Sequence, residues 1–207
     1  MTGQVELVDF FLTTSESAAA WTRFLNELYR RGLKGQALQL LTKDGNLGLD
    51  AACEQVYPTV AVQLCWVHKL RNVARYLPRR LYATCLQALK QVYQAPDRRT
   101  AERRLTAWAA RWETEAPRAV RSVTRHQEAL LAHFACPVAH RVKIRTTNII
   151  ERAFREVRRR THPMNQFITL TSCDRLTFAI LSALNGRWAR RRGLPGFKPI
   201  AAPLALA

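Results

Sequence analysis

The first part of the chain alternates between short apolar runs and one amphipathic stretch. Residues 5–12 are apolar and rich in β-favouring side chains, which predicts a strand. The polar residues 13–16 have the spacing of a capping box and predict the start of a helix, which Gly32 then ends. Within this helix the apolar positions recur at helical spacing: Ala20, Trp21, Phe24, Leu25 and Leu28.

Short elements follow this helix. Residues 38–42 are a compact apolar run that predicts a buried strand. Residues 47–56 predict a helix that stops before Pro58, and residues 60–66 predict a third strand. The resulting order, β-α-β-α-β, indicates an α/β layer with parallel pairing.

The hydrophobic pattern changes again at about residue 68. From there to residue 134 it is helical, with breaks at Pro78, Pro96 and Pro117. An all-helical block after an α/β beginning predicts an inserted subdomain.

The last third contains a basic connector over residues 138–145 and two further predicted helices, over 148–160 and 170–192. The residues beyond are rich in proline and predict a flexible tail. Four regions result: a partial α/β core (1–67), a helical insertion (68–137), C-terminal helices of the core (138–192) and the tail (193–207).

Charge narrows the possible functions. The 207 residues include 33 Lys and Arg against 15 Asp and Glu, a net charge of +18 with a pI near 10.9. This excess is typical of proteins that bind a phosphate backbone, although a ribosome-like or membrane-surface protein shows it too. No apolar run approaches the length of a membrane span, and we find no signal peptide. The odd number of cysteines, five, favours reduced cytosolic thiols.

Two acids stand out against this positive charge. Asp44 follows a predicted buried strand, where a rigid element ends in solvent and a carboxylate can bind a metal ion. It also fits an ordinary Asp-Gly turn. Glu151 lies at the start of a predicted basic helix, where Asn148 three residues earlier would make it part of a capping box. Both interpretations remain open for each acid.

Cys65 and His68 form a C-x-x-H pair at the end of the third predicted strand. A structural zinc site needs two further ligands, and the spacing to the available His133, Cys136 and His140 matches no common zinc motif. We therefore expect no zinc site here. A buried thiol beside a hydrogen-bonded imidazole is the simpler alternative.

Basic side chains gather after residue 68 and again over 141–160. Such runs usually form solvated faces, but this excess favours contact with phosphates. The residues that we expect to contact DNA are Arg71, Arg145, Asn148, Arg152, Arg155, Arg158, Arg159 and Arg160.

Several blocks of sequence, taken in order, resemble the catalytic region of the Mutator-type transposases of bacterial insertion sequences, over roughly residues 1–190. Each block is weak alone, whereas their order and separation are specific. The blocks lie at residues 15–17, 21–25, 31–33, 44–49, 65–72 and 146–155.

The resemblance implies an RNase H-like core with an all-helical insertion between the second and third catalytic acids. These transposases use two aspartates and one glutamate to hold two divalent metals, Mg²⁺ or Mn²⁺. By position Asp44 is similar to the second aspartate and Glu151 to the glutamate, and Cys65 and His68 match a signature close to the active site. Implied with them are cleavage and strand transfer of double-stranded DNA at element ends and target, a possible homo-oligomer, and a bacterial, nucleoid-associated location.

The first catalytic aspartate is where the chain departs from this pattern. Asp9 is the nearby candidate, but one predicted helix separates it from Asp44, whereas an RNase H-like sheet has two more strands between these acids. We therefore interpret Asp9 as a strand residue and the core as N-terminally incomplete. The chain is then expected to be a truncated, inactive copy of a transposase. A non-catalytic nucleic-acid-binding remnant and an RNase H-like nuclease are the alternatives.

Overall fold

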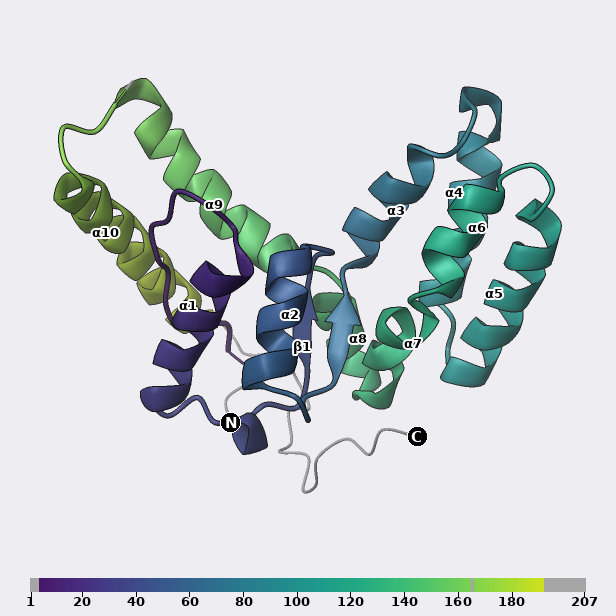
Figure 1. The fold of residues 1–207 in the computed structure, drawn as a ribbon, viewed down its shortest axis with the longest axis horizontal. Helices are drawn as coiled ribbons and strands as arrows, with labels where there is room; N and C mark the ends of the chain where they lie inside the picture. The colour runs from purple at the N-terminus through teal and green to yellow at the C-terminus, as the bar shows by residue number, and fades with distance from the viewer. Residues whose placement is uncertain (1–3, 165, 192–207) are drawn as a thin grey trace.

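The computed structural model describes residues 4–164 and 166–191. This part of the chain is mostly helical, with a single pair of strands among the described residues. Figure 1 shows the strands and helix α2 between two groups of helices, α9 and α10 on one side and α3 to α6 on the other. The predicted tail lies outside the described residues. No described helix is both long and apolar enough to span a membrane.

The sheet consists of β1 (Leu41–Lys43) and β2 (Val62–Leu64), which run parallel. Their register pairs Leu41 with Val62 and Lys43 with Leu64, so both strands end at the same edge. Helix α2 (Leu47–Val56) connects them, with the predicted bounds. The side chain of Asn46 accepts a hydrogen bond from the backbone N–H of Leu49 and so caps the helix. This β-α-β unit confirms an α/β element, although both strands are shorter than predicted.

The N-terminal strand predicted over 5–12 is wrong, since no strand is present there. The side chain of Asn185 on α10 (Leu170–Ala189) makes the backbone hydrogen bonds that a neighbouring strand would make. Its Oδ1 accepts from the backbone N–H of Leu7 at 2.7 Å, and its Nδ2 donates to the carbonyl of Leu7 at 2.8 Å. Phe11 stacks on Phe24, 4.6 Å between ring centroids. Leu7, Phe10 and Phe11 of this segment therefore pack against helices, and the order of elements begins with a helix.

Helix α1 (Ala18–Arg30) starts later than the predicted capping box, because Ser17 is the residue that caps it. Gly32 follows the helix with a φ of 110°, a conformation that glycine adopts without strain and that confirms the predicted end. The helix packs along α2, and together they bury Leu25, Leu28 and Cys53.

The predicted helical block is confirmed. It contains α3 (Trp66–Ala74), α4 (Tyr82–Tyr93), α5 (Arg98–Trp112), α6 (Pro117–Thr124) and α7 (Gln127–Leu131), with short 3-10 turns at Arg79–Leu81 and Ala132–Ala135. Local signals set its boundaries: Asp97 caps α5 and Pro117 occupies the first turn of α6. The block shares one core that begins at the sheet with Leu64 and the fully buried Trp66.

Three α-helices and a short 3-10 turn at His162–Met164 complete the described chain. Residues predicted as a basic connector form α8 (Val138–Ile144), so that prediction is wrong. Helix α9 (Asn148–Thr161) begins where predicted, and α10 ends three residues before the predicted end at residue 192. Helices α9 and α10 pack together over Ala153, Leu181 and Leu184.

Candidate active site

At the carboxyl end of the sheet, the backbones of two predicted site residues, Asp44 and Cys65, lie close together. The N–H of Cys65, directly after β2, donates to the carbonyl of Lys43 at 2.8 Å. Asp44 is the residue that follows Lys43, so its backbone lies beside the start of α3. The next N–H, that of Trp66, donates to the carbonyl of Arg145 at 3.1 Å and brings the approach to α9 to the same edge.

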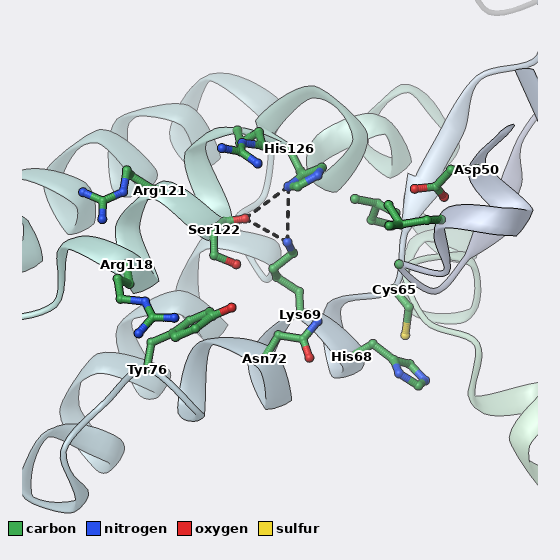
Figure 2. Close-up of a pocket in the computed structure, with 14 residues that line it drawn as sticks. Asp50, Cys65, His68, Lys69, Asn72, Tyr76, Arg118, Arg121, Ser122 and His126 are labelled. Atoms are coloured by element: carbon green, nitrogen blue, oxygen red, sulfur yellow. Dashed lines mark hydrogen bonds between the residues drawn. The ribbon is translucent and has the colours of Figure 1, made fainter.

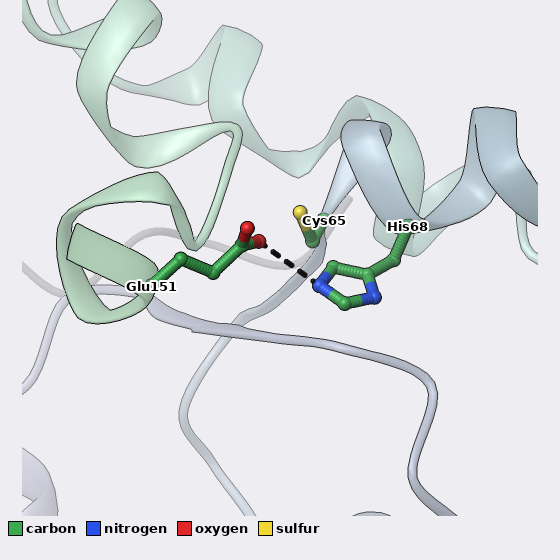
Figure 3. A group of neighbouring side chains, drawn as sticks. All are labelled: Cys65, His68 and Glu151. Carbon is green, nitrogen blue, oxygen red and sulfur yellow. Dashed lines mark hydrogen bonds and ion pairs between the residues drawn. The ribbon is translucent and has the colours of Figure 1, made fainter. Parts of the chain in front are cut away.

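Glu151 reaches this edge from α9 and joins the C-x-x-H pair. Ligand atoms of Cys65, His68 and Glu151 all lie within 4.8 Å of one another. Figure 3 shows the three side chains pointing toward one another. The Nε2 of His68 is 3.1 Å from a carboxylate oxygen of Glu151. Cys65 is buried, whereas the other two side chains are about one-third exposed. Residues more than eighty positions apart therefore form one group at the surface.

Thr147 connects the members of this group. Its backbone N–H donates to the Sγ of Cys65 at 3.3 Å, and its Oγ1 lies 3.3 Å from that sulfur and 3.2 Å from Oε1 of Glu151. A hydroxyl has one proton, so it donates to one of these two acceptors at a time. Thr147 is also the residue that precedes α9, in the position predicted for Asn148. The capping-box explanation of Glu151 is therefore wrong.

Asp44 shows the turn geometry that was its alternative explanation. Its Oδ1 accepts from the backbone N–H of Asn46 at 3.3 Å, and the side chain is half-buried. It is not a member of the group formed by Cys65, His68 and Glu151. A role of Asp44 as a metal ligand remains a prediction, supported by the backbone contact between Lys43 and Cys65.

The donor atoms determine which ions the group fits. Carboxylate oxygens suit Mg²⁺ or Mn²⁺, whereas a thiolate and an imidazole suit Zn²⁺. The further zinc ligands considered from the sequence, His133, Cys136 and His140, are not in the group; His133, for example, is fully buried with its Nδ1 3.0 Å from the Oε1 of Gln63. A tetrahedral zinc site would need a fourth ligand besides the three atoms present.

The predicted DNA-contacting residues divide into two groups. Arg152, Arg155 and Arg158 are exposed on α9, and none of them takes part in an ion pair within the described residues. Arg71 and Asn148 are exposed as well. By contrast, other arginines are already engaged. Arg159 and Arg160 pair with Glu156, and Arg145 donates to the carbonyl of Tyr93 at 2.9 Å.

The model of the family described as "Transposase, Mutator family" matches residues 1–191. The chain belongs to this family. A transposase for insertion sequence element ISRM5 from Rhizobium meliloti (strain 1021) is 36% identical over 186 residues, 90% of this chain and 46% of that protein. A transposase for IST2 from Acidithiobacillus ferrooxidans is 34% identical over 90% of this chain and 62% of that protein. For a transposase of IS406 from Burkholderia multivorans, the identity is 36% over 91% and 48%. The chain thus spans about half the length of the curated relatives it matches.

In this Mutator-family chain, sequence reasoning missed two features near the candidate site. The first is Thr147, which belongs to the family block at 146–155 but carried no expected role. The second is a basic pocket beside His68 that receives arginines from α6. The spacing of Arg118, Arg121 and Arg125 on one helix face could have indicated that pocket.

Proposed function

We propose that this chain forms part of the catalytic region of a transposase that cuts DNA and transfers the cut strand in a metal-dependent reaction. One observation carries the proposal: Glu151 and the C-x-x-H pair, from two separate blocks of the Mutator pattern, meet at the sheet edge where Asp44 follows β1. We further propose that the β-α-β unit and α9 belong to an RNase H-like core, with the helices of 68–137 as its insertion.

In this proposal Asp44 and Glu151 supply oxygen ligands to Mg²⁺ or Mn²⁺. Such an ion, when bound, stabilises charge on the scissile phosphate and activates water or a 3′-hydroxyl. His68 acts as a positioning residue: with Glu151 ionised, its Nε2–H donates to the carboxylate and fixes the direction of that side chain. The hydroxyl of Thr147 lies 3.2 Å from the same oxygen and can donate to it.

Double-stranded DNA is the partner in this proposal, as element end and as target, and the reaction would take place on the bacterial nucleoid. The free arginines of α9, Arg152, Arg155 and Arg158, offer phosphate contacts close to Glu151 on the same helix. Transposition joins DNA ends, so an assembly of more than one copy is part of the proposal.

The test is a titration of Mn²⁺ into the 207-residue chain, in which calorimetry measures the affinity. Glu151→Gln and Asp44→Asn should each weaken Mn²⁺ binding by roughly tenfold or more, since each removes a charged ligand. Asp174→Asn is the matched control, an exposed acid on α10, and should leave binding unchanged. If the two site variants bind Mn²⁺ as tightly as the wild type, the chain is a DNA-binding protein without a catalytic centre at Glu151.

Two further measurements sharpen the proposal. We expect no stoichiometric zinc in the purified chain, because Cys65, His68 and Glu151 supply three ligand atoms where a structural tetrahedral site has four; zinc that is lost on Cys65→Ser would contradict this. We also expect no Mg²⁺-dependent nicking by this chain alone, since Asp9 is ion-paired with Arg31 and only two acids are then assigned to the metals. Nicking that stops on Asp9→Asn would identify Asp9 as the third ligand, and nicking without joining would favour a nuclease.

A further inference from the structure

A pocket of about 420 Å³ lies between α3 and α6, next to the candidate active site. Figure 2 shows its lining, in which His68 stands at one end and basic side chains of α6 at the other. His68 is shared, because its ring also contacts Glu151. A ligand in the pocket would therefore lie beside the group that we propose to be catalytic.

Lys69 forms the floor of this pocket and is buried, with 8% of its surface exposed. Its Nζ donates to the carbonyl of Ser122 at 2.8 Å and lies 3.4 Å from Nδ1 of His126. Neither partner carries a negative charge, and burial lowers the pKa of the Lys69 ammonium. An ammonium has three N–H donors, so one remains for a ligand.

The wall opposite Lys69 adds three guanidinium groups. Arg118, Arg121 and Arg125 follow one another at intervals of three and four residues, which places them on one face of α6 and its C-terminal cap. None of the three takes part in an ion pair within the described residues. The pocket's one carboxylate, Asp50, lies 2.6 Å from the Nζ of Lys43. The positive charge of the pocket is thus not neutralised by the protein.

Tyr76 adds an aromatic surface at the rim. The residue is 40% exposed, and the guanidinium of Arg118 lies over one face of its ring, 4.9 Å from the centroid. An exposed aromatic ring beside arginines is the arrangement that holds bases of unpaired strands, because every base has a face that stacks. The pocket therefore combines donors for a phosphate with a surface for a base.

We propose that this pocket binds one unpaired nucleotide of the DNA substrate, with its phosphate held by Lys69 and the arginines of α6 and its base against Tyr76. This inference rests on the proposed function, which identifies the anion as DNA. The volume is in the range of sites for one small ligand, about 300–1,000 Å³, so a single nucleotide can enter where a duplex cannot. The neighbouring His68 then directs the strand from the pocket toward Glu151.

The experiment compares two fluorescent duplexes of equal sequence, one blunt and one with a short single-stranded overhang, by anisotropy with the 207-residue chain. The wild type should prefer the overhang by roughly tenfold, the value of about one stacked base with its phosphate. Arg121→Gln and Arg125→Gln should remove this preference and leave blunt-duplex binding nearly unchanged. The matched control is Arg103→Gln, an exposed arginine on α5, which should retain the preference.

Photocrosslinking of the wild type provides a second readout. It uses no variant, so the result cannot be caused by a variant that fails to fold. An overhang containing 5-iodouracil should crosslink to Tyr76, and a crosslink to α9 instead would overturn the pocket assignment. Competition with pyrophosphate shows whether the ligand of the pocket is a free phosphate compound or a DNA strand. Pyrophosphate binding without any preference for the overhang would also overturn the pocket assignment. Failure of the proposed function would give a different result. Mn²⁺ binding would then be unaffected by the substitutions at Asp44 and Glu151, while the preference for the overhang would remain.

Discussion

His133 is the residue for which burial has the clearest consequence. The imidazole is fully buried, and desolvation lowers its pKa from 6.5 to about 4. Its Nδ1 lies 3.0 Å from Oε1 of Gln63 and 3.2 Å from the carbonyl oxygen of Leu130, so Nδ1 carries the proton of the neutral ring. Gln63 and Trp66 also donate to the carbonyl of Leu130. The neutral His133 thus belongs to the network that joins β2 to α7.

We predict from this that His133 makes the fold sensitive to acid. Below pH 6.5 the unfolded chain binds a proton at this position, whereas the folded chain does so only near pH 4. The free energy of unfolding should therefore fall as the pH drops through this range, by up to about 3 kcal/mol from this group. Urea denaturation at several pH values measures the effect. His133→Gln keeps a side-chain donor without a titrating ring and should flatten the dependence; an unchanged slope would assign it to other groups.

At the level of single residues, the sequence was sufficient to single out Glu151 and the C-x-x-H pair, because both lie in ordered family blocks. It could not show that His68 contacts Glu151, since that contact depends on how α9 meets the sheet. The part played by Thr147 was hidden for the same reason. A threonine before a helix is usually only a cap, and here its hydroxyl and N–H face the thiol of Cys65.

Among the elements, α1 and α2 approach so closely that only glycine fits at position 48. A Cβ there would lie 2.6 Å from the carbonyl oxygen of Glu16 and 2.9 Å from the backbone nitrogen of Ala18. Backbone atoms cannot move aside as a flexible side chain can. We predict that Gly48→Ala lowers the free energy of unfolding by about 1–3 kcal/mol, measured by urea denaturation.

Gly186→Ala is the control for that substitution. Gly186 lies in α10, and a methyl group added there would meet no neighbouring atom within 4 Å. Alanine at this position should be neutral or should stabilise the chain by about 0.4–1 kcal/mol, because it restricts the unfolded state. Equal effects of the two substitutions would show that the contact between α1 and α2 does not limit stability.

Helix α9 provides the prediction about DNA. Each phosphate that the helix neutralises contributes about −0.9 to the slope of log K against log salt on a duplex. Replacing Arg158, Arg159 and Arg160 with alanine should make this slope shallower. Most of the change should come from Arg158, because Glu156 already pairs with Arg159 and Arg160. Affinity measurements from low to moderate salt test this.

The single variants separate these contributions. Arg158→Ala alone should account for most of the triple variant's change in slope, and Arg103→Ala on α5 should cause none. If the slope is unchanged in the triple variant, these residues form a solvated face and α9 does not contact DNA through its last turns.

An element could be predicted when the residues that determine it lie close to it in the sequence. The bounds of α2 were predicted correctly because Asn46 caps one end and Pro58 follows the other. Residues 5–12 have the composition of a strand, but their partners are helices and the amide of Asn185, which no local pattern reveals. Over 138–145 the density of basic residues obscured a short helix, α8.

For the whole molecule, the contact between Asn185 and Leu7 decides how the N-terminal segment is held. The two residues are 178 positions apart, and one amide satisfies both backbone groups of Leu7. The contact places Leu7 and Phe10 on the cluster that α9 and α10 form around Leu181. An unpaired, part-buried backbone group costs on the order of 1–3 kcal/mol, so this amide stabilises the approach of the chain's first segment to its last helix.

We therefore predict that Asn185→Ala lowers the free energy of unfolding by about 1–3 kcal/mol and frees the N-terminal segment before the rest unfolds. Hydrogen exchange should show faster exchange at Leu7 in this variant, with exchange in α4 and α5 unchanged. Asn185→Asp is the matched variant: it keeps an acceptor for the N–H of Leu7 and loses the donor to its carbonyl, so its effect should be intermediate. Protection at Leu7 that survives Asn185→Ala would mean that apolar packing, and not the amide, holds this segment on α10.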